Sequence, residues 1–218
     1  MPKKSLLRKW MAKRLVALLL LLSVSVAVFS QETPDSVKIK HWDISAVTLF
    51  VFTPDNSFIL PVGYINYKRW HLEPRYNYEN LETFSMFAGY NIAGGGKFKY
   101  ILTPMLGGVA GRTDGIAPGF EADLGYGRFG FYTEMEYLFD LYVTADSYYY
   151  VWSHFRFGIT KWMSVGIAGG RNRVYQNDVE VQRGISLGFT IKKFTITGYY
   201  YNPFTPDNYG SVSVFMRF

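Results

Sequence analysis

Residues 70–79 read WHLEPRYNYE, and in this stretch apolar and polar side chains alternate one by one. Successive side chains of a β-strand point to opposite faces, so this pattern predicts a strand with one apolar and one polar face. The segment 209–218, YGSVSVFMRF, shows a similar alternation. No segment after residue 31 has a sustained helical period, so the sequence predicts an all-β protein. The polar face of the expected strand 70–79 carries His71, Glu73, Arg75, Asn77 and Glu79.

A basic residue followed closely by an aromatic one recurs six times along the chain. A hairpin of two strands of about 9 to 11 residues, with its turn and loop, needs a repeat of this size, and that is the strand length that crosses a bilayer. Six hairpins predict a closed antiparallel transmembrane β-barrel of about twelve strands, with ten as the alternative. The aromatic members are Trp42, Trp70, Phe98, Phe129, Trp162 and Phe194.

The twelve expected strands leave short basic turns on one side of the barrel and loops on the other. Pro61, Pro74 and Pro104 fall inside strands, where each removes a pairing donor, so we expect bulges or local breaks there. We expect the loops 53–57, 80–82, 111–116, 141–146, 175–178 and 202–208 to be short and to stay out of the lumen. The expected strands are 42–52, 58–67, 70–79, 83–92, 98–110, 117–127, 129–140, 147–159, 162–174, 179–191, 194–201 and 209–218.

Aromatic side chains gather near both ends of the expected strands, where amphipathic rings suit membrane interfaces. The six that follow the basic turns should form one girdle. Tyr148 to Tyr150 and Tyr199 to Tyr201 should form the other. A soluble lipocalin-like barrel or sandwich is the alternative, but it gains nothing from such girdles.

The first 30 residues are typical of a secretory signal peptide. They hold six of the 23 basic residues and none of the 17 acidic ones, followed by an apolar stretch that ends near Ser30. We expect cleavage after Ser30, a short periplasmic lead-in at 31–41 and the barrel at 42–218. An uncleaved anchor is the alternative, although about 15 apolar residues fall short of the ~20 that span a bilayer. The rest of the chain is neutral, which argues against a nucleic-acid partner.

With its signal peptide, its aromatic-flanked hairpins and its last residues SVSVFMRF, the chain resembles the outer-membrane β-barrel proteins of Gram-negative bacteria. The resemblance covers all of the chain after the signal peptide. It implies an outer-membrane location, with membrane lipid and the barrel-insertion machinery as partners. It also implies that the terminal aromatic residue, Phe218, is the insertion signal. The resemblance names no solute and no oligomeric state.

Charged residues are expected to gather in the lumen. A tight turn at 127–128 places Glu121 beside Glu134, and a turn near 160–161 is expected to place Glu134 beside His154, with Asp123, Glu136 and Arg156 flanking this row. His71, Glu73 and Arg75 should also point inward. We interpret the barrel as a small passive channel for ions or small solutes. The alternatives are a non-conducting structural or binding barrel, in which the charges form a network that fills the bore, and a lipid-modifying enzyme.

Little in the sequence favours chemistry at a reactive site. Ser153 and His154 are adjacent and therefore on opposite faces of a strand, and no serine and histidine lie two residues apart on one strand, as a hydrolase site there would require. His71 and Glu73 could bind a metal, but the sequence offers no clear third ligand. The chain has no cysteine. We therefore expect no metal, no cofactor and no catalytic residue.

Overall fold

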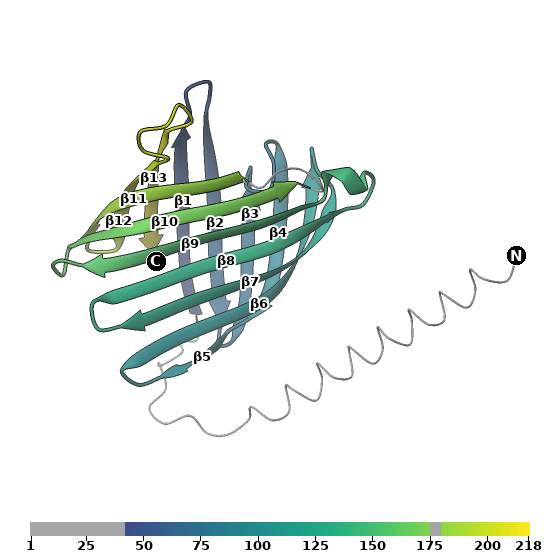
Figure 1. The fold of residues 1–218 in the computed structure, drawn as a ribbon. Helices are drawn as coiled ribbons and strands as arrows, with labels where there is room; N and C mark the ends of the chain where they lie inside the picture. Colours follow the sequence, from purple (N-terminus) through teal and green to yellow (C-terminus); the bar gives the residue numbers. More distant parts are fainter. Residues whose placement is uncertain (1–41, 175–179) are drawn as a thin grey trace, which may run out of the picture. The chain divides into compact units, whose positions relative to one another are not determined.

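The computed structural model describes residues 42–174 and 180–218, which fold as antiparallel strands in one sheet (Figure 1). The strands are β1 (Trp42–Phe52), β2 (Ser57–Tyr67), β3 (Trp70–Tyr76), β4 (Thr83–Tyr90), β5 (Ile92–Gly95), β6 (Phe98–Gly111), β7 (Gly115–Tyr126), β8 (Phe129–Asp140), β9 (Tyr148–Gly158), β10 (Met163–Val174), β11 (Glu180–Ile191), β12 (Phe194–Tyr201) and β13 (Tyr209–Arg217). A single 3-10 turn, Thr144–Asp146, precedes β9. Among these residues no helix is long and apolar enough to cross a membrane.

The sheet closes on itself. β1 pairs with both β2 and β13, and β4 pairs with β6, so every strand except the short β5 has a partner on either side. β4 and β5 are two pieces of one strand, because they run along β6 in the same register, with Gly89 opposite Met105 and Ile92 opposite Leu102. The described part of the chain therefore forms a closed twelve-stranded barrel, as the sequence predicted.

Prolines interrupt the ladders without shifting them. The β2–β3 ladder has no paired residues between Val62 and Ile65, next to Pro74, yet its register is the same on both sides. The interruption between β4 and β5 lies opposite Pro104, and the β7–β8 ladder is broken at Pro118. A missing N–H removes a hydrogen bond but adds no residue, so these sites are breaks and not bulges. Pro61 stays paired with Thr48 on β1.

The strand bounds match the expected ones closely, and those of 129–140 and 194–201 match to the residue. The clearest difference is in the expected strand 70–79, which ends at Tyr76. Asn77 has a left-handed φ of 59°, and its side-chain oxygen accepts a hydrogen bond from the Glu82 N–H at 2.7 Å. This local bond turns the chain, so Tyr78 and Glu79 lie in the turn between β3 and β4 instead of in a strand.

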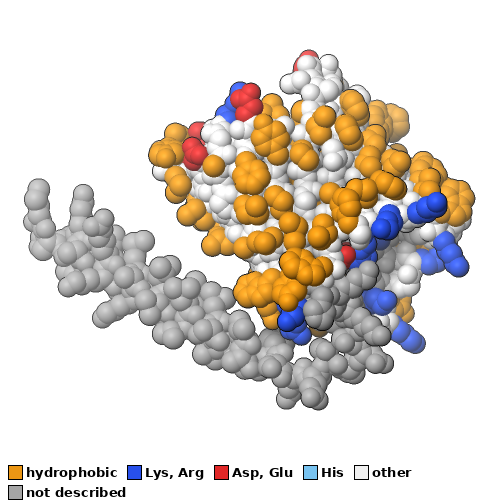
Figure 2. Space-filling model, turned by 180° about the vertical axis from the view of Figure 1, so that it is seen from behind, with side chains coloured by type: hydrophobic (Ala, Val, Ile, Leu, Met, Phe, Trp, Pro, Cys, Tyr) orange, Lys and Arg blue, Asp and Glu red, His pale blue; other side chains and the backbone are white. Residues whose placement is uncertain are grey.

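The outer face of the barrel is apolar. Figure 2 shows hydrophobic side chains over the visible face, with Lys and Arg gathered toward one end. The six aromatic residues of the first expected girdle are all exposed on this outer face, with Trp70 64% exposed. The prediction of the second girdle is wrong, because Tyr148, Tyr150, Tyr199 and Tyr201 line the interior. Only their neighbours of opposite parity, such as Tyr200, face outward.

We call the end with the tight turns, including 127–128 and 192–193, the turn end, and the opposite end the loop end. The expected signal peptide and lead-in at 1–41, and the loop 175–178, lie outside the described residues. The backbone N–H of Phe218 donates to the Ile44 carbonyl at 2.9 Å, and its ring is 63% exposed. Its role as an insertion signal stays a prediction.

Candidate functional site

The interior of the barrel holds two different regions. Beneath β3, β4, β6, β7 and β8 it is filled by buried side chains, including an apolar cluster of Phe87, Met105, Val109, Ala117 and Leu138. The rest of the interior is an open cavity of about 1260 Å³. The free space is therefore displaced toward β1, β2, β9, β12 and β13.

Arg75 holds the filled region together. Its Nε donates to Glu73 Oε1 at 2.9 Å and its Nη1 to Glu136 Oε2 at 3.0 Å, so it links β3 to β8 across the strands between them. Its guanidinium also lies 4.2 Å from the centre of the Phe87 ring. The side chain is only 1% exposed. Such a charge is stable in the interior only because carboxylates and ring faces replace its water.

The turn after β3 reaches into the lumen above Arg75. Tyr78 O–H donates to Glu134, its ring lies over the Arg75 guanidinium, and the Glu79 carboxyl accepts a bond from Ser85 Oγ at 2.7 Å. Burial raises the pKa of Glu79, and the nearby Arg75 offsets only part of that rise. The sequence analysis placed residues 78 and 79 in the strand 70–79; in the structure both belong to the turn, and the Tyr78 side chain lies inside the barrel.

Three potential metal ligands meet beside this network. Ligand atoms of His71, Glu73 and Glu121 all lie within 4.8 Å of one another, and all three side chains are buried. Glu121, on β7, is the third neighbour that the sequence could not identify for His71 and Glu73. Glu73 is already bonded by His71 Nε2 at 3.0 Å and by Arg75. Glu121 instead accepts a hydrogen bond from the Tyr132 hydroxyl at 2.6 Å.

The expected charge row is only partly assembled. Glu121 lies opposite Glu134, and Tyr132 O–H donates to both carboxylates, at 2.6 Å and 3.1 Å. The expected neighbour of Glu134 on β9 is wrong: Glu134 lies opposite Trp152, two residues from His154. His154 instead contacts Ser186 Oγ at 2.8 Å. A slip of two residues keeps every side chain on its face but moves His154 toward the turn end.

The row is also divided between the two regions. Glu134, Glu136, Asp123, His154 and Arg156 line the cavity. Glu121 and the three inward residues of β3 are buried, and none of the four lines it. Whether any of these residues filters ions stays a prediction.

The cavity reaches both ends of the barrel. At the loop end it is lined by Arg112, Thr113 and Asp146, and at the turn end by Thr195 and Arg217. Its wall therefore extends over the full length of the strands.

One wall of the cavity is aliphatic. On β1 and β2 the inward residues face each other in three successive pairs, and the sequence analysis did not anticipate them. The signal was present, because both strands are apolar on both faces, WDISAVTLFVF and SFILPVGYINY. The pairs are Val47 with Val62, Leu49 with Leu60 and Val51 with Phe58.

Another part of the cavity wall, on β9, β12 and β13, is aromatic. Trp152 Nε1, on β9, donates to Tyr201 O–H, on β12, at 3.1 Å, so the two rings bridge over β10 and β11. Tyr201 stacks on Tyr199 at 5.9 Å and on Tyr209 at 4.7 Å. We call Trp152, Tyr199, Tyr201 and Tyr209 the aromatic layer.

Glycines beneath the aromatic layer make room for it. A Cβ on Gly184 would lie 2.7 Å from the Tyr201 ring, and one on Gly166 would lie 2.7 Å from His154 Nε2. A side chain at either position would therefore displace the ring above it, Tyr201 or His154.

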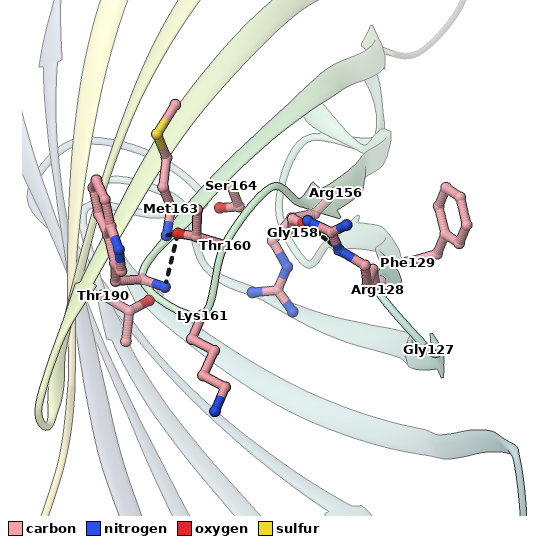
Figure 3. Close-up of a pocket in the computed structure, with 12 residues that line it drawn as sticks. Gly127, Arg128, Phe129, Arg156, Gly158, Thr160, Lys161, Met163, Ser164 and Thr190 are labelled. Atoms are coloured by element: carbon pink, nitrogen blue, oxygen red, sulfur yellow. Dashed lines mark hydrogen bonds between the residues drawn. The ribbon is translucent and has the colours of Figure 1, made fainter.

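A smaller pocket of about 590 Å³ lies at the turn end (Figure 3). Arg128, Arg156 and Lys161 line it, and Arg128 Nε donates to the Gly158 carbonyl at 2.6 Å. Arg156 lines this pocket and the large cavity alike. The turn end thus presents positive charge to whatever approaches it.

The fold of this protein is similar to that of several solved β-barrel structures. No family profile matches the sequence, and no curated protein matches it. A KdgM porin structure aligns over 80% of this chain and 99% of its own, with a TM-score of 0.58 and 11% identity. A NanC porin structure aligns over 80% and 98%, with a TM-score of 0.56 and 10% identity. The barrel has the fold of outer-membrane porins. At this identity the likeness establishes the fold alone.

Proposed function

We propose that this protein is an integral outer-membrane barrel that passes small solutes passively. The observation that carries the proposal is the cavity, whose lining extends from the residues of the loop end to those of the turn end. A barrel that served only as a wall would gain stability by filling this space. The fold supports the same proposal, since the similar KdgM and NanC structures are those of porins.

The proposed location follows from the outer face. Its exposed apolar side chains suit lipid, and the exposed rings at the turn end suit the interface. We propose that the chain is exported with a cleaved signal peptide at residues 1–30, and that the insertion machinery recognises Phe218. Membrane lipid and that machinery are the proposed partners.

Liposome swelling tests the proposal. Vesicles that contain the refolded barrel should swell in isotonic solutions of small uncharged sugars, and the rate should fall as the sugar grows. Vesicles with heat-unfolded protein are the control. Folded barrels that give no swelling with the smallest sugar would reject a passive channel.

One observation favours a second function, a non-conducting binding barrel. The Arg75 network and the apolar cluster fill the interior beneath five strands, and the side chains of Tyr78 and Glu79 extend over them. If the remaining cavity were closed in the membrane, the barrel could still hold a ligand. Swelling separates the two functions, because only the channel passes solute.

A further inference from the structure

The aliphatic wall is unusual for the interior of a membrane barrel. Lumens of such barrels are polar, because water fills them. Here three facing pairs on β1 and β2 turn apolar side chains inward, and Phe215, opposite Val47 on β13, extends the same surface. We call these seven residues the aliphatic wall. Exposing such a surface to lumen water is unfavourable unless another apolar surface covers it.

The aromatic layer completes an apolar chamber. Its polar atoms are partly occupied within the layer and at its edge, since Trp152 donates to Tyr201 and Tyr209 O–H donates to Gln182 at 2.7 Å. Between the two walls, β13 presents Ser211 and Ser213, which are short hydroxyl side chains. The chamber thus offers apolar faces and a narrow hydroxyl edge.

The two walls of this chamber are uncharged. The side chains of the aliphatic wall, the aromatic layer and the two serines carry no formal charge. Arg112 and Asp146 lie at the loop end, and Asp123, Arg156 and Arg217 toward the turn end. Glu134 and Glu136 face the chamber from β8, but tyrosine hydroxyls and Arg75 already bond them. Glu79, in the turn after β3, also lines the cavity, and its Oε2 has no hydrogen-bond partner among the described residues. Away from Glu79, a charged solute would lose its water in the middle of the chamber without gaining a free partner.

We propose that this chamber binds uncharged solutes that carry an aromatic ring together with hydroxyl groups. The ring would lie between the aliphatic wall and the aromatic layer, with its hydroxyl groups toward Ser211 and Ser213. The cavity of about 1260 Å³ accommodates such a molecule. This inference deepens the proposed function and rests on it only for the route by which the solute arrives.

Calorimetric titration of the barrel in lipid nanodiscs tests the inference. Phenyl β-glucoside supplies a ring and hydroxyl groups, and methyl β-glucoside is the matched probe that lacks the ring. The phenyl compound should bind at least about tenfold more tightly, since burying a ring on both faces removes apolar surface from water. Equal affinity for the two probes, or no binding of either, would overturn the proposal.

Variants locate the site. Leu49→Gln keeps the approximate volume of the side chain but makes the centre of the aliphatic wall polar, and it should weaken phenyl β-glucoside roughly tenfold. Leu60→Gln, opposite Leu49 on β2, should do the same and serves if the first variant does not fold. Asp123→Asn, which lines the cavity outside both walls, is the control and should leave the affinity unchanged. A folded Leu49→Gln or Leu60→Gln barrel with unchanged affinity would contradict the placement.

Binding and transport fail independently in this design. A barrel that binds phenyl β-glucoside but passes no sugar in the swelling assay rejects the channel and keeps the binding site. A barrel that passes sugars but shows no preference for the ring rejects the binding site and keeps the channel.

Discussion

Replacing Arg75 by methionine should destabilise the barrel more than any other single removal of charge. The guanidinium is 1% exposed and is bonded by Glu73 at 2.9 Å and Glu136 at 3.0 Å, with Glu79 at 3.5 Å. Methionine fills much of the same space but leaves these buried carboxylates without their cation. Breaking a buried ion pair from one side costs about 3–5 kcal/mol, and we expect a loss of that size in the free energy of unfolding.

Urea titration of the refolded barrel in lipid vesicles, followed by tryptophan fluorescence, measures this loss. Arg217→Met is the matched control, because Arg217 is bonded to Asp43 at the turn end with its side chain 55% exposed. That exposed pair should contribute no more than about 1 kcal/mol. The double variant Arg75→Met with Glu136→Gln should recover part of the stability. If Arg75→Met lost no more stability than Arg217→Met, the proposed role of the buried network would be refuted.

Three further outcomes follow from the same structure. Glu134→Gln should lower the preference for cations, measured as the reversal potential in a KCl gradient, because Glu134 lines the cavity. Glu121 lies opposite Glu134 but outside the cavity, so Glu121→Gln should leave the reversal potential unchanged, and equal shifts in the two variants would reject this distinction. Deleting Phe218 removes one backbone hydrogen bond, worth about 1 kcal/mol, so the urea midpoint of inserted barrels should hardly change. The yield of heat-modifiable barrel in membranes should fall, and an unchanged yield would argue against an insertion signal. Because burial raises the pKa of Glu79 in the folded state, ionising this carboxyl lowers the stability of the wild type as the pH rises. The stability of Glu79→Gln relative to the wild type should therefore increase between acidic and neutral pH, and urea midpoints that differ by a constant amount across this range would contradict it.

The period-two pattern, together with the six basic–aromatic repeats that mark the hairpins, was enough to predict the strands, because a bilayer fixes their length. Residues 129–140 and 194–201 show this, since their bounds are those expected. The turn at Asn77 was missed because it depends on side-chain bonds to Glu82 and Ile59, which the alternation of the following residues conceals. Pairing across tight turns was predictable, as Glu121 and Glu134 show.

Pairing across the longer loop was not predictable to the residue. The loop between β8 and β9 folds around Asp140, which accepts bonds from the N–H groups of Tyr142 and Val143, and contains a 3-10 turn. This conformation sets Glu134 opposite Trp152 instead of His154. The chamber was missed for another reason. Strands that are apolar on both faces show no alternation, so the sequences of β1 and β2 did not reveal that apolar side chains face the lumen there.

Single-channel recording in a planar bilayer tests the central claim, an open path through the cavity, most directly. Ser213 lines the cavity from β13, and its neighbour Val214 points to the outer face. The wild-type barrel should give discrete conductance steps, Ser213→Trp should reduce them strongly by filling the path, and Val214→Trp should leave them unchanged. Folded wild-type barrels that insert without conducting, or equal conductance in both tryptophan variants, would contradict the account.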